Sequence, residues 1–358
     1  MDRAFNFAWN PYNKSTPVIS GMNRPMVLIT SAALGFIAGT MLAATVQVLP
    51  TVYEAGHFFA VPETRDGQRL KLQVDTGGGG GGGMYWIGAA VAQRLHLKII
   101  DCIADGQHLP VARLPDYQAG MGLPPPGNGP CRSALLVRPQ ADSSYDGQLG
   151  AGYLPGRIWT FDYPAHRLML EGDVWQPDPA AHRTPLGFPH DASGKPNSGF
   201  ARITIRVDGQ PLDMLLDTGA SSYPTPVAAR ISSNRTVHGE GVTSYITTGT
   251  LERWHKAHPN WRVVENADDK VAAKPLKRII EVPEVEIAGW SVGPVWFTEQ
   301  PDKSYHEYIA QWMDKPTEGA VGGNVFRHFA MTIDYPHDAA YFRCVNGCKL
   351  VDTSSSTH

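Results

Sequence analysis

The sequence predicts an all-β protein of two homologous β-barrel lobes with few short helices, preceded by an N-terminal hydrophobic helix. Two short blocks of sequence occur twice in the 358-residue chain. Its 37 glycines and 29 prolines follow no fixed period, which is typical of many turns between short strands. A hydrophobic content of 42% over this length is enough for two domains, each with its own core.

The first repeated block is an apolar stretch that ends in Asp-Thr-Gly. Leu72–Gly77 resembles Met214–Gly219, so Asp75 and Asp217 occupy equivalent positions 142 residues apart. A single Asp-Thr-Gly arises easily by chance. Two copies, each at the end of an apolar stretch that is typical of a strand, are hard to attribute to chance.

The second repeated block is longer and aligns without a gap. Residues 147–164 match residues 319–336 at a constant offset of 172, and both copies begin with Gly-x-x-Gly and end with Asp-Tyr-Pro. The second half therefore carries 30 extra residues between its two blocks. Two blocks repeated in the same order indicate a duplicated lobe. Asp162 and Asp334, one in each copy, are interpreted as strand-end or turn residues.

The repeat also sets the expected domain boundaries. Residues 175–198 contain five prolines among polar residues, and proline does not join a central strand, so this stretch is interpreted as a linker. The predicted division is a cytoplasmic and signal or anchor segment, an N-terminal lobe, the linker, a C-terminal lobe and a disordered tail, at residues 1–50, 51–174, 175–198, 199–350 and 351–358.

Several shorter elements are expected within the lobes. Arg202–Val207 alternates apolar and polar residues and precedes Asp208-Gly209, a hairpin signal. Helices are expected at Ala89–Leu97, which has spaced apolar residues, and at Thr250–His258, where Thr248 or Thr250 can cap the start. Further strands are expected at Arg69–Val74, Pro211–Leu216 and Val282–Ile287.

The N-terminal segment carries an export signal. Met26–Val48 contains no charged side chain and is long enough to span a bilayer as a helix. Arg3, Lys14 and Arg24 precede it, which places the N-terminus in the cytoplasm and the rest of the chain outside it. Small residues near its end fit a cleavage site imperfectly, which favours a retained anchor over a cleaved signal. Both alternatives stay open.

The four cysteines fit an oxidising compartment. Cys102, Cys131, Cys344 and Cys348 allow three pairings, of which Cys102–Cys131 and Cys344–Cys348 are local. An Asn-Gly turn between the last two cysteines can close a hairpin. The alternative is four buried thiols, and the export signal favours disulfides.

Charge and histidine content argue against other classes of protein. The net charge of −3 provides no polycation for nucleic acid, so no such partner is expected. Among the 13 histidines, His255 and His258 form an i, i+3 pair, and no HExxH or CxxC motif occurs in the sequence. Most of these histidines are therefore interpreted as surface or loop residues rather than metal ligands.

Each residue of Asp-Thr-Gly has a physical role in a catalytic loop. The carboxylate supplies the chemistry, the threonine hydroxyl can bond to the opposite loop, and glycine allows close backbone approach. Two such loops meeting between lobes would bring Asp75 and Asp217 together. Two adjacent carboxyl groups share a proton, so one can act as general base on water while the other donates a hydrogen bond to a substrate carbonyl.

These motifs resemble pepsin/retropepsin-type aspartic proteases. Leu215–Ser222 matches the active-site signature of that family, and residues 147–150 and 319–322 resemble its apolar-apolar-Gly strands. Ile87–Leu97, followed by Ala104-Asp105-Gly106 and Leu109–Val111, resembles the retropepsin order of helix and strand. The resemblance covers roughly residues 52–350. It implies a pepsin-like bilobal β-barrel fold, peptide-bond hydrolysis, no metal and no cofactor.

The resemblance also assigns roles to individual residues. Asp75 and Asp217 would be catalytic, and the neighbours Thr76, Gly77, Thr218 and Gly219 would support them. The flap that closes over substrate would lie near Tyr117 or Tyr245. The substrate would be a peptide or protein, and two lobes in one chain remove the need for a homodimer.

One departure from the family leaves alternatives open. Six further glycines, residues 78–83, follow the first Asp-Thr-Gly, and such a run is entropically costly to order. The alternative function is a catalytically inactive peptide-binding envelope protein that retains the protease fold. A third interpretation, an unrelated β-rich binding module, requires the two aspartates to lie far apart.

Overall fold

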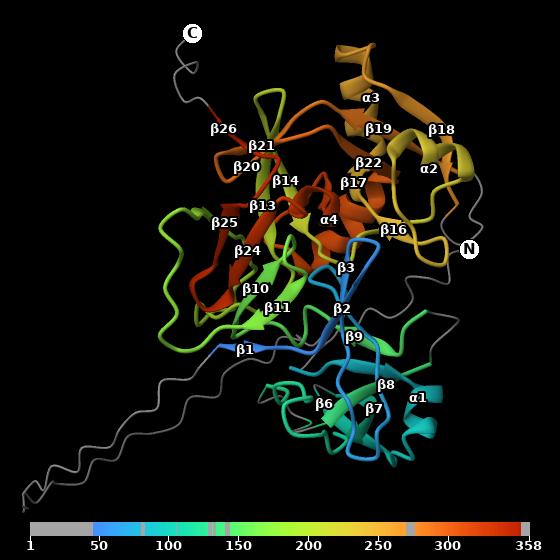
Figure 1. Ribbon diagram of the computed structural model, residues 1–358, viewed down its shortest axis with the longest axis vertical. Helices are drawn as coiled ribbons and strands as arrows, with labels where there is room; N and C mark the ends of the chain where they lie inside the picture. The colour runs from blue at the N-terminus through green and yellow to red at the C-terminus, as the bar shows by residue number, and fades with distance from the viewer. Residues whose placement is uncertain are drawn as a thin grey trace, which may run out of the picture.

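The computed structural model describes residues 46–79, 83–104, 106–127, 131, 134–139, 144–269 and 276–351. The protein is mostly β, with three large sheets and a few short helices. Figure 1 shows one sheet at the bottom, one at the top and the third between them. We call the half with the lower sheet lobe one and the half with the upper sheet lobe two.

Lobe one is built on an eight-stranded sheet with α1 (Ala89–Arg94) beside it. In spatial order its strands are β2 (Thr51–Glu54), β3 (His57–Ala60), β4 (Leu72–Val74), β9 (Gly147–Leu149), β5 (Trp86–Gly88), β8 (Ala134–Arg138), β7 (Gln107–Arg113) and β6 (Ile99–Ala104).

Lobe two is built on a ten-stranded sheet. In spatial order its strands are β18 (Val263–Asp268), β19 (Lys277–Val282), β22 (Val295–Gln300), β17 (Ser244–Thr247), β23 (Gly319–Val321), β14 (Gln210–Leu216), β13 (Arg202–Val207), β20 (Val285–Ile287), β21 (Trp290–Val292) and β26 (Lys349–Leu350). Its smaller elements are β15 (Ser221–Ser222), β16 (Gly241–Val242), α2 (Pro226–Ser232), α3 (Thr248–Ala257), η2 (Ser304–Tyr308), η3 (Ile309–Trp312), α4 (Gly323–Phe326) and η4 (Tyr335–His337).

A six-stranded sheet joins the two halves. Its strands in order are β1 (Gln47–Val48), β11 (Arg167–Leu170), β10 (Ile158–Asp162), β24 (Phe329–Asp334), β25 (Ala339–Cys344) and β12 (His182–Pro185). Strands β10 and β24 are antiparallel with Thr160 directly opposite Thr332, and the two hydroxyl oxygens lie 2.8 Å apart. These threonines are equivalent residues of the repeat, so a local twofold axis passes between them.

Local sequence explains the hairpin that leads to the second Asp-Thr-Gly. In β13, Ile203, Ile205 and Val207 are buried on one face, as their alternation predicted. Asp208 and Gly209 both have positive φ, at 51° and 69°, which suits the tight turn between β13 and β14. The turn directs the buried end of β14 toward the centre of the molecule.

Equivalent strands surround the ends of β4 and β14. Strand β9 is parallel to β4 and antiparallel to β5, and β5 is parallel to β8. Strand β23 is likewise parallel to β14 and antiparallel to β17, and β17 is parallel to β22. This shared topology brings the Gly-x-x-Gly blocks beside the Asp-Thr-Gly loops, although the blocks are far apart in sequence.

Two expectations from the sequence are corrected. In the described residues the large sheets are open rather than closed barrels. The main hydrophobic cluster is continuous across both lobes, because strands such as β10 and β24 of the joining sheet contribute to it, so the lobes do not have fully separate cores. Residues 175–198, which the sequence analysis interprets as a linker, include the edge strand β12. Pro185 ends this strand, and proline is tolerated at a sheet edge.

The predicted N-terminal helix lies almost wholly outside the described residues. Its last two residues, Gln47 and Val48, instead form β1 and pair with β11. Within the described part of the chain, no helix is both long and apolar enough to cross a membrane. The strand expected at Val282–Ile287 is divided: β19 ends at Val282 and β20 begins at Val285, with Pro283 between them.

Both predicted disulfides are present. Cys102–Cys131 joins β6 to the segment before β8, and Cys344–Cys348 closes the turn after β25. Their Cα atoms lie 6.0 and 6.2 Å apart. Disulfides persist in oxidising compartments, so these bonds indicate an exported protein.

Candidate active site

The two Asp-Thr-Gly loops meet between the lobes and bond to each other through their threonines. The Thr76 hydroxyl donates to the Leu216 carbonyl at 2.7 Å, and the Thr218 hydroxyl donates to the Val74 carbonyl at 2.8 Å. Each hydroxyl oxygen also accepts the backbone N–H of the other threonine, at 3.0 and 3.1 Å. These four reciprocal bonds are buried and fix one loop against the other.

The glycines of the two triplets hold the carboxyl groups at this junction. The N–H of Gly77 donates to Asp75 Oδ1 and the N–H of Gly219 to Asp217 Oδ1, both at 2.9 Å. A Cβ on Gly77 would lie 2.4 Å from Asp217 Cγ, and one on Gly219 would lie 2.1 Å from Asp75 Cγ. Each glycine therefore contacts both aspartates, so the two carboxyl groups flank the same small space.

Both carboxyl groups are largely withdrawn from water. Asp75 is 8% exposed and Asp217 is 7% exposed. Burial raises the pKa of Tyr163 well above its usual value, and the charges of the two aspartates raise it further. Burial likewise raises the pKa of Tyr305, with a contribution from Asp217. The aspartates therefore lie in a poorly solvated region where interactions between charges are strong.

In lobe one, Gln148 of β9 supports the aspartate from behind. Its Nε2 donates to Asp75 Oδ2 at 2.7 Å, and its Oε1 accepts from Trp86 Nε1 at 3.1 Å. A Cβ on Gly78 would lie 2.4 Å from the Gln148 Oε1 and 2.5 Å from Asp75 Oδ2. The position of Gln148 thus explains why the residue after the first triplet is a glycine, Gly78.

Lobe two has a different arrangement at the same place. Gln148 is replaced by Ala320 at the equivalent position of the repeat, and Ala220 follows the triplet. Support comes instead from Tyr245 of β17, whose hydroxyl accepts the N–H of Ser221 at 3.0 Å and donates to the Ser221 carbonyl. Buried His57 of β3 crosses from lobe one, with its Nε2 3.2 Å from Ser221 Oγ.

The repeated Gly-x-x-Gly blocks pack directly against these loops. A Cβ on Gly150 would lie 2.4 Å from the Gly79 carbonyl oxygen, and a Cβ on Gly322 would lie 1.8 Å from the Thr243 carbonyl oxygen. Ala151 N–H also donates to the Gly78 carbonyl at 2.9 Å, which orders the start of the glycine run. Residues 80–82 of that run lie outside the described residues.

The two predicted flap residues lie in ordered surroundings. Tyr245 is buried in the interior strand β17. Tyr117 forms an isolated bridge with Thr64, and its hydroxyl lies 2.7 Å from that of buried Tyr85. Neither tyrosine is at the tip of a described hairpin, and a flap role for either stays a prediction.

Three residues around the site were not identified from the sequence. They are His57, Trp86 and Gln148. Gln148 had a usable signal, because it differs from Ala320 inside an otherwise ungapped repeat. His57 and Trp86 belong to no repeated motif, and only the packing of distant strands brings them to the loops.

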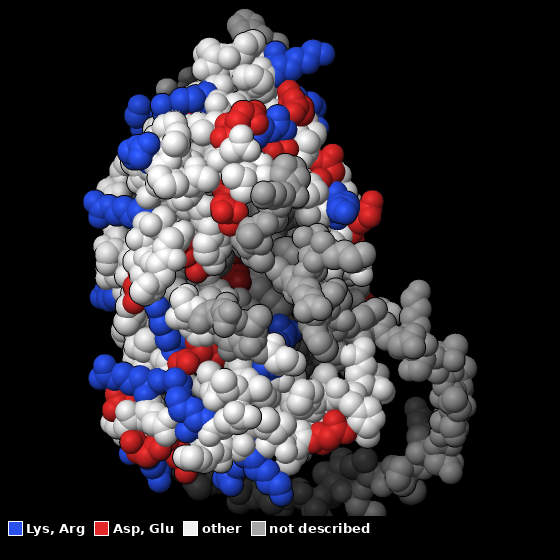
Figure 2. Space-filling view, turned by 90° about the vertical axis from the view of Figure 1, so that its right-hand side faces the viewer, with Lys and Arg blue, Asp and Glu red and all other residues white. Residues whose placement is uncertain are grey.

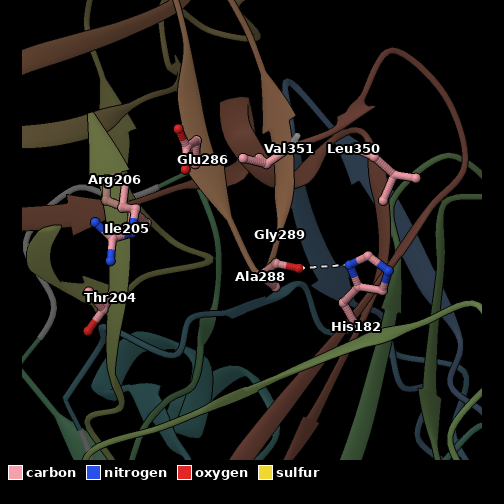
Figure 3. Close-up of a pocket in the computed structure, with 9 residues that line it drawn as sticks. All are labelled: His182, Thr204, Ile205, Arg206, Glu286, Ala288, Gly289, Leu350 and Val351. Atoms are coloured by element: carbon pink, nitrogen blue, oxygen red, sulfur yellow. Dashed lines mark hydrogen bonds between the residues drawn. The ribbon is translucent and has the colours of Figure 1, made fainter. Parts of the chain in front are cut away.

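The surface is hollowed between the lobes. Figure 2 shows this hollow about halfway along the molecule, with acidic side chains deep inside it and basic side chains on its lower wall. A separate pocket of about 360 Å³ lies beside strands β13 and β20. Its lining residues include Arg206, Glu286 and Leu350. Figure 3 shows His182 there, bonded through Nδ1 to the Ala288 carbonyl at 2.9 Å. None of its lining residues belongs to an Asp-Thr-Gly loop.

No metal-binding group of three or more His, Cys, Asp or Glu side chains occurs among the described residues. No family model matches the sequence, and no curated protein matches it.

Several solved structures resemble the chain at low identity. A basic 7S globulin from soybean is 11% identical, over 84% of this chain and 94% of that chain, with a TM-score of 0.40. Conglutin gamma, a basic 7S globulin from lupine seeds, is 11% identical over 85% and 95%, with a TM-score of 0.41. An aspartic proteinase from Irpex lacteus is 12% identical over 87% and 100%, with a TM-score of 0.44. With every TM-score below 0.5, these likenesses assign no function to this chain.

Proposed function

We propose that this protein is an aspartic endopeptidase in which Asp75 and Asp217 activate a water molecule to hydrolyse a peptide bond. The observation that supports this most strongly is the reciprocal bonding of Thr76 and Thr218 across the lobe junction. These bonds, together with the glycine contacts of both triplets, hold two buried carboxyl groups against one space. That geometry is what shared-proton catalysis requires.

The chemistry follows from the proximity of two like groups. Two adjacent carboxylates do not both ionise easily, so the pair retains one proton. The ionised member removes a proton from water, and the resulting hydroxide attacks the peptide carbonyl carbon. The protonated member donates to the carbonyl oxygen as it becomes negatively charged. The tetrahedral intermediate then breaks its C–N bond, and the leaving amine takes up a proton from the pair.

Surrounding groups position the two carboxyl groups for these steps. The Gly77 and Gly219 N–H groups each hold one carboxyl oxygen, Oδ1, in place. Gln148 holds the other oxygen of Asp75. Because the protein dipoles are already oriented, little reorganisation is needed as charge moves. Gln148 is therefore a positioning residue in this proposal.

The proposed setting follows from the disulfides and the N-terminal segment. We place the enzyme outside the cytoplasm, in the cell envelope or beyond it, with the uncharged segment before β1 as a membrane anchor or signal. Its partners would be peptide or protein substrates rather than nucleic acid. Two lobes in one chain supply both aspartates, so a monomer is sufficient.

A cleavage assay with matched variants tests the proposal. The full chain in detergent is incubated with an unstructured protein and a peptide library between pH 3 and 7. Asp75→Asn and Asp217→Asn should each lower kcat/KM by roughly a thousandfold, while Asp116→Asn, an exposed change in lobe one, should leave it unaltered. Cleavage that persists in both active-site variants would disprove the proposal. Peptide binding without cleavage by the wild type would favour an inactive peptide-binding protein instead.

A further inference from the structure

Arg138, at the end of β8, is a cation without a counter-charge. Its guanidinium forms no ion pair and no hydrogen bond with the described residues, and its Nε is buried without a partner. Its Cζ lies 5.3 Å from the centroid of the Trp86 ring. Burial lowers the pKa of this guanidinium, although arginine stays charged. A charged group in this state is costly unless a ligand completes its bonding.

A chain of contacts connects Arg138 to the proposed catalytic pair. Trp86, which the guanidinium overlies, donates through Nε1 to Gln148, and Gln148 donates to Asp75 Oδ2. A Cβ on Gly79, two residues beyond the first triplet, would lie 3.6 Å from both terminal nitrogens of Arg138. The guanidinium therefore lies on the lobe-one wall beside the active-site loop.

The charge of Arg138 also acts on lobe two. Burial raises the pKa of Tyr308 in η2, and the charge of Arg138 opposes that rise. The terminal nitrogens of Arg138 are not among the fully buried atoms without partners, so they reach solvent. A group between two lobes, open to solvent at its tip, is accessible to a substrate that binds between them.

The fold itself does not require a cation at this position. Trp86 pairs with Gln148 and Leu136, and its counterpart Tyr245 pairs with Ala320 and Thr298. By this register the lobe-two equivalent of Arg138 is the neutral Gln300, which bonds to Lys277. The unpartnered cation is thus a feature of lobe one alone.

We propose that Arg138 binds an acidic side chain of the peptide substrate, Asp or Glu, close to the scissile bond. This inference rests on the proposed function. A guanidinium can bond to a carboxylate through two parallel N–H groups, which favours acidic over isosteric neutral side chains. Because an extended peptide rises about 3.3 Å per residue, the acidic residue would lie within about three residues of the cleaved bond.

Matched peptides test this assignment. A peptide that the wild type cleaves is resynthesised with Glu, Gln or Lys at each position around the bond. At one position the wild type should cleave the Glu peptide about tenfold or more faster, in kcat/KM, than the Gln peptide. The preference should fade below about pH 4, where the glutamate becomes protonated.

Variants of Arg138 identify the source of the preference. Arg138→Gln should remove the preference for Glu, and Arg138→Glu should replace it with a preference for Lys. Arg113→Glu, an exposed change in the neighbouring strand with the same change in charge, should retain the wild-type preference. Thermal unfolding checks that each variant is folded, and Arg138→Gln suffices if the charge reversal is not tolerated.

Failure of this inference differs from failure of the proposed function. A wild type that cleaves peptides without any preference for Glu overturns the role of Arg138 and leaves the protease intact, as does a preference that survives in Arg138→Gln. If the wild type cleaves nothing, the proposed function fails. Binding of fluorescent Glu and Gln peptides then tests Arg138 directly, and equal affinities overturn the assignment.

Discussion

The active-site loops of the two lobes are alike where they touch each other and different where they are supported. Thr76 and Thr218 exchange the same bonds, and Gly77 and Gly219 make the same contacts. Behind them, lobe one relies on Gln148 and lobe two relies on Tyr245. The junction is symmetric because Thr76 and Thr218 bond to each other and each triplet glycine lies against the aspartate of the other lobe. The supporting residues make no such contact with each other and are free to diverge.

The largest effect is expected from adding a methyl group at the symmetric junction. Gly77→Ala and Gly219→Ala should each lower kcat/KM by about a hundredfold or more, because the new Cβ would displace the opposite aspartate. Gly79→Ala is the matched control, since its Cβ meets nothing closer than 3.6 Å. Equal activities of all three variants in the peptide assay would contradict the geometry of the junction.

Removing each of the two disulfides should lower the free energy of unfolding by a different amount. Cys102–Cys131 spans 29 residues and Cys344–Cys348 spans 4. Loop entropy predicts losses of roughly 3–4 kcal/mol for the first pair and about 2 kcal/mol for the second, when both cysteines are changed to serine. Guanidinium unfolding measures the two variants side by side. A larger loss from the short loop would show that loop entropy does not govern these bonds.

The threonine bonds should respond equally in both lobes. Thr76→Val and Thr218→Val each leave a buried carbonyl and a buried N–H without a partner, at a cost of about 1–3 kcal/mol in the free energy of unfolding. The double variant should lose about the sum of the two, because the single variants remove different pairs of bonds. Thr76→Ser, which keeps the hydroxyl, serves as the control. If the two single variants lost clearly different amounts of unfolding free energy, the two threonines would not be energetically equivalent.

Gln148 should contribute to catalysis, although lobe two has no equivalent glutamine. Gln148→Leu removes the amide donor to Asp75 Oδ2, and kcat should fall about tenfold with little change in KM, because substrate contacts stay intact. Gln148→Glu keeps the shape but replaces the donor with an acceptor, and should not restore kcat. The idea is untenable if steady-state kinetics show Gln148→Leu with wild-type kcat.

The smallest effect is expected at an ion pair of lobe two. The bond from Arg278 lowers the pKa of Glu299, so this carboxylate stabilises the fold above about pH 4.3 and the contribution is lost as pH falls through its lowered pKa. Glu299→Gln should cost no more than about 1 kcal/mol at pH 7, because the pair is partly screened by solvent. Unfolding at pH 7 and pH 3 compares the proteins, and the difference should be smaller at pH 3 than at pH 7.

Much of the site could be predicted because its essential residues are local motifs. Asp-Thr-Gly carries the carboxylate, hydroxyl and glycine in three consecutive positions, and the repeat identifies both copies. The flap could not be predicted in the same way. Tyr245 stands in a glycine-flanked stretch that resembles a turn, but pairing with β22 and β23 makes it an interior strand. Gln148 and Arg138 gain their roles only through neighbours from other strands.

The sequence by itself determined the duplication, the two aspartate loops and the β13–β14 hairpin, while the structure selected the two local cysteine pairs among the three possible pairings. The duplication, the loops and the hairpin depend on patterns within a few residues, or on similarity of the chain to itself, so no long-range contact is needed to find them. The tertiary structure decided the shared six-stranded sheet, the continuous core and the residues behind each aspartate. Each of these depends on the pairing of strands that are distant in sequence, and that pairing is set by the packing of the whole molecule.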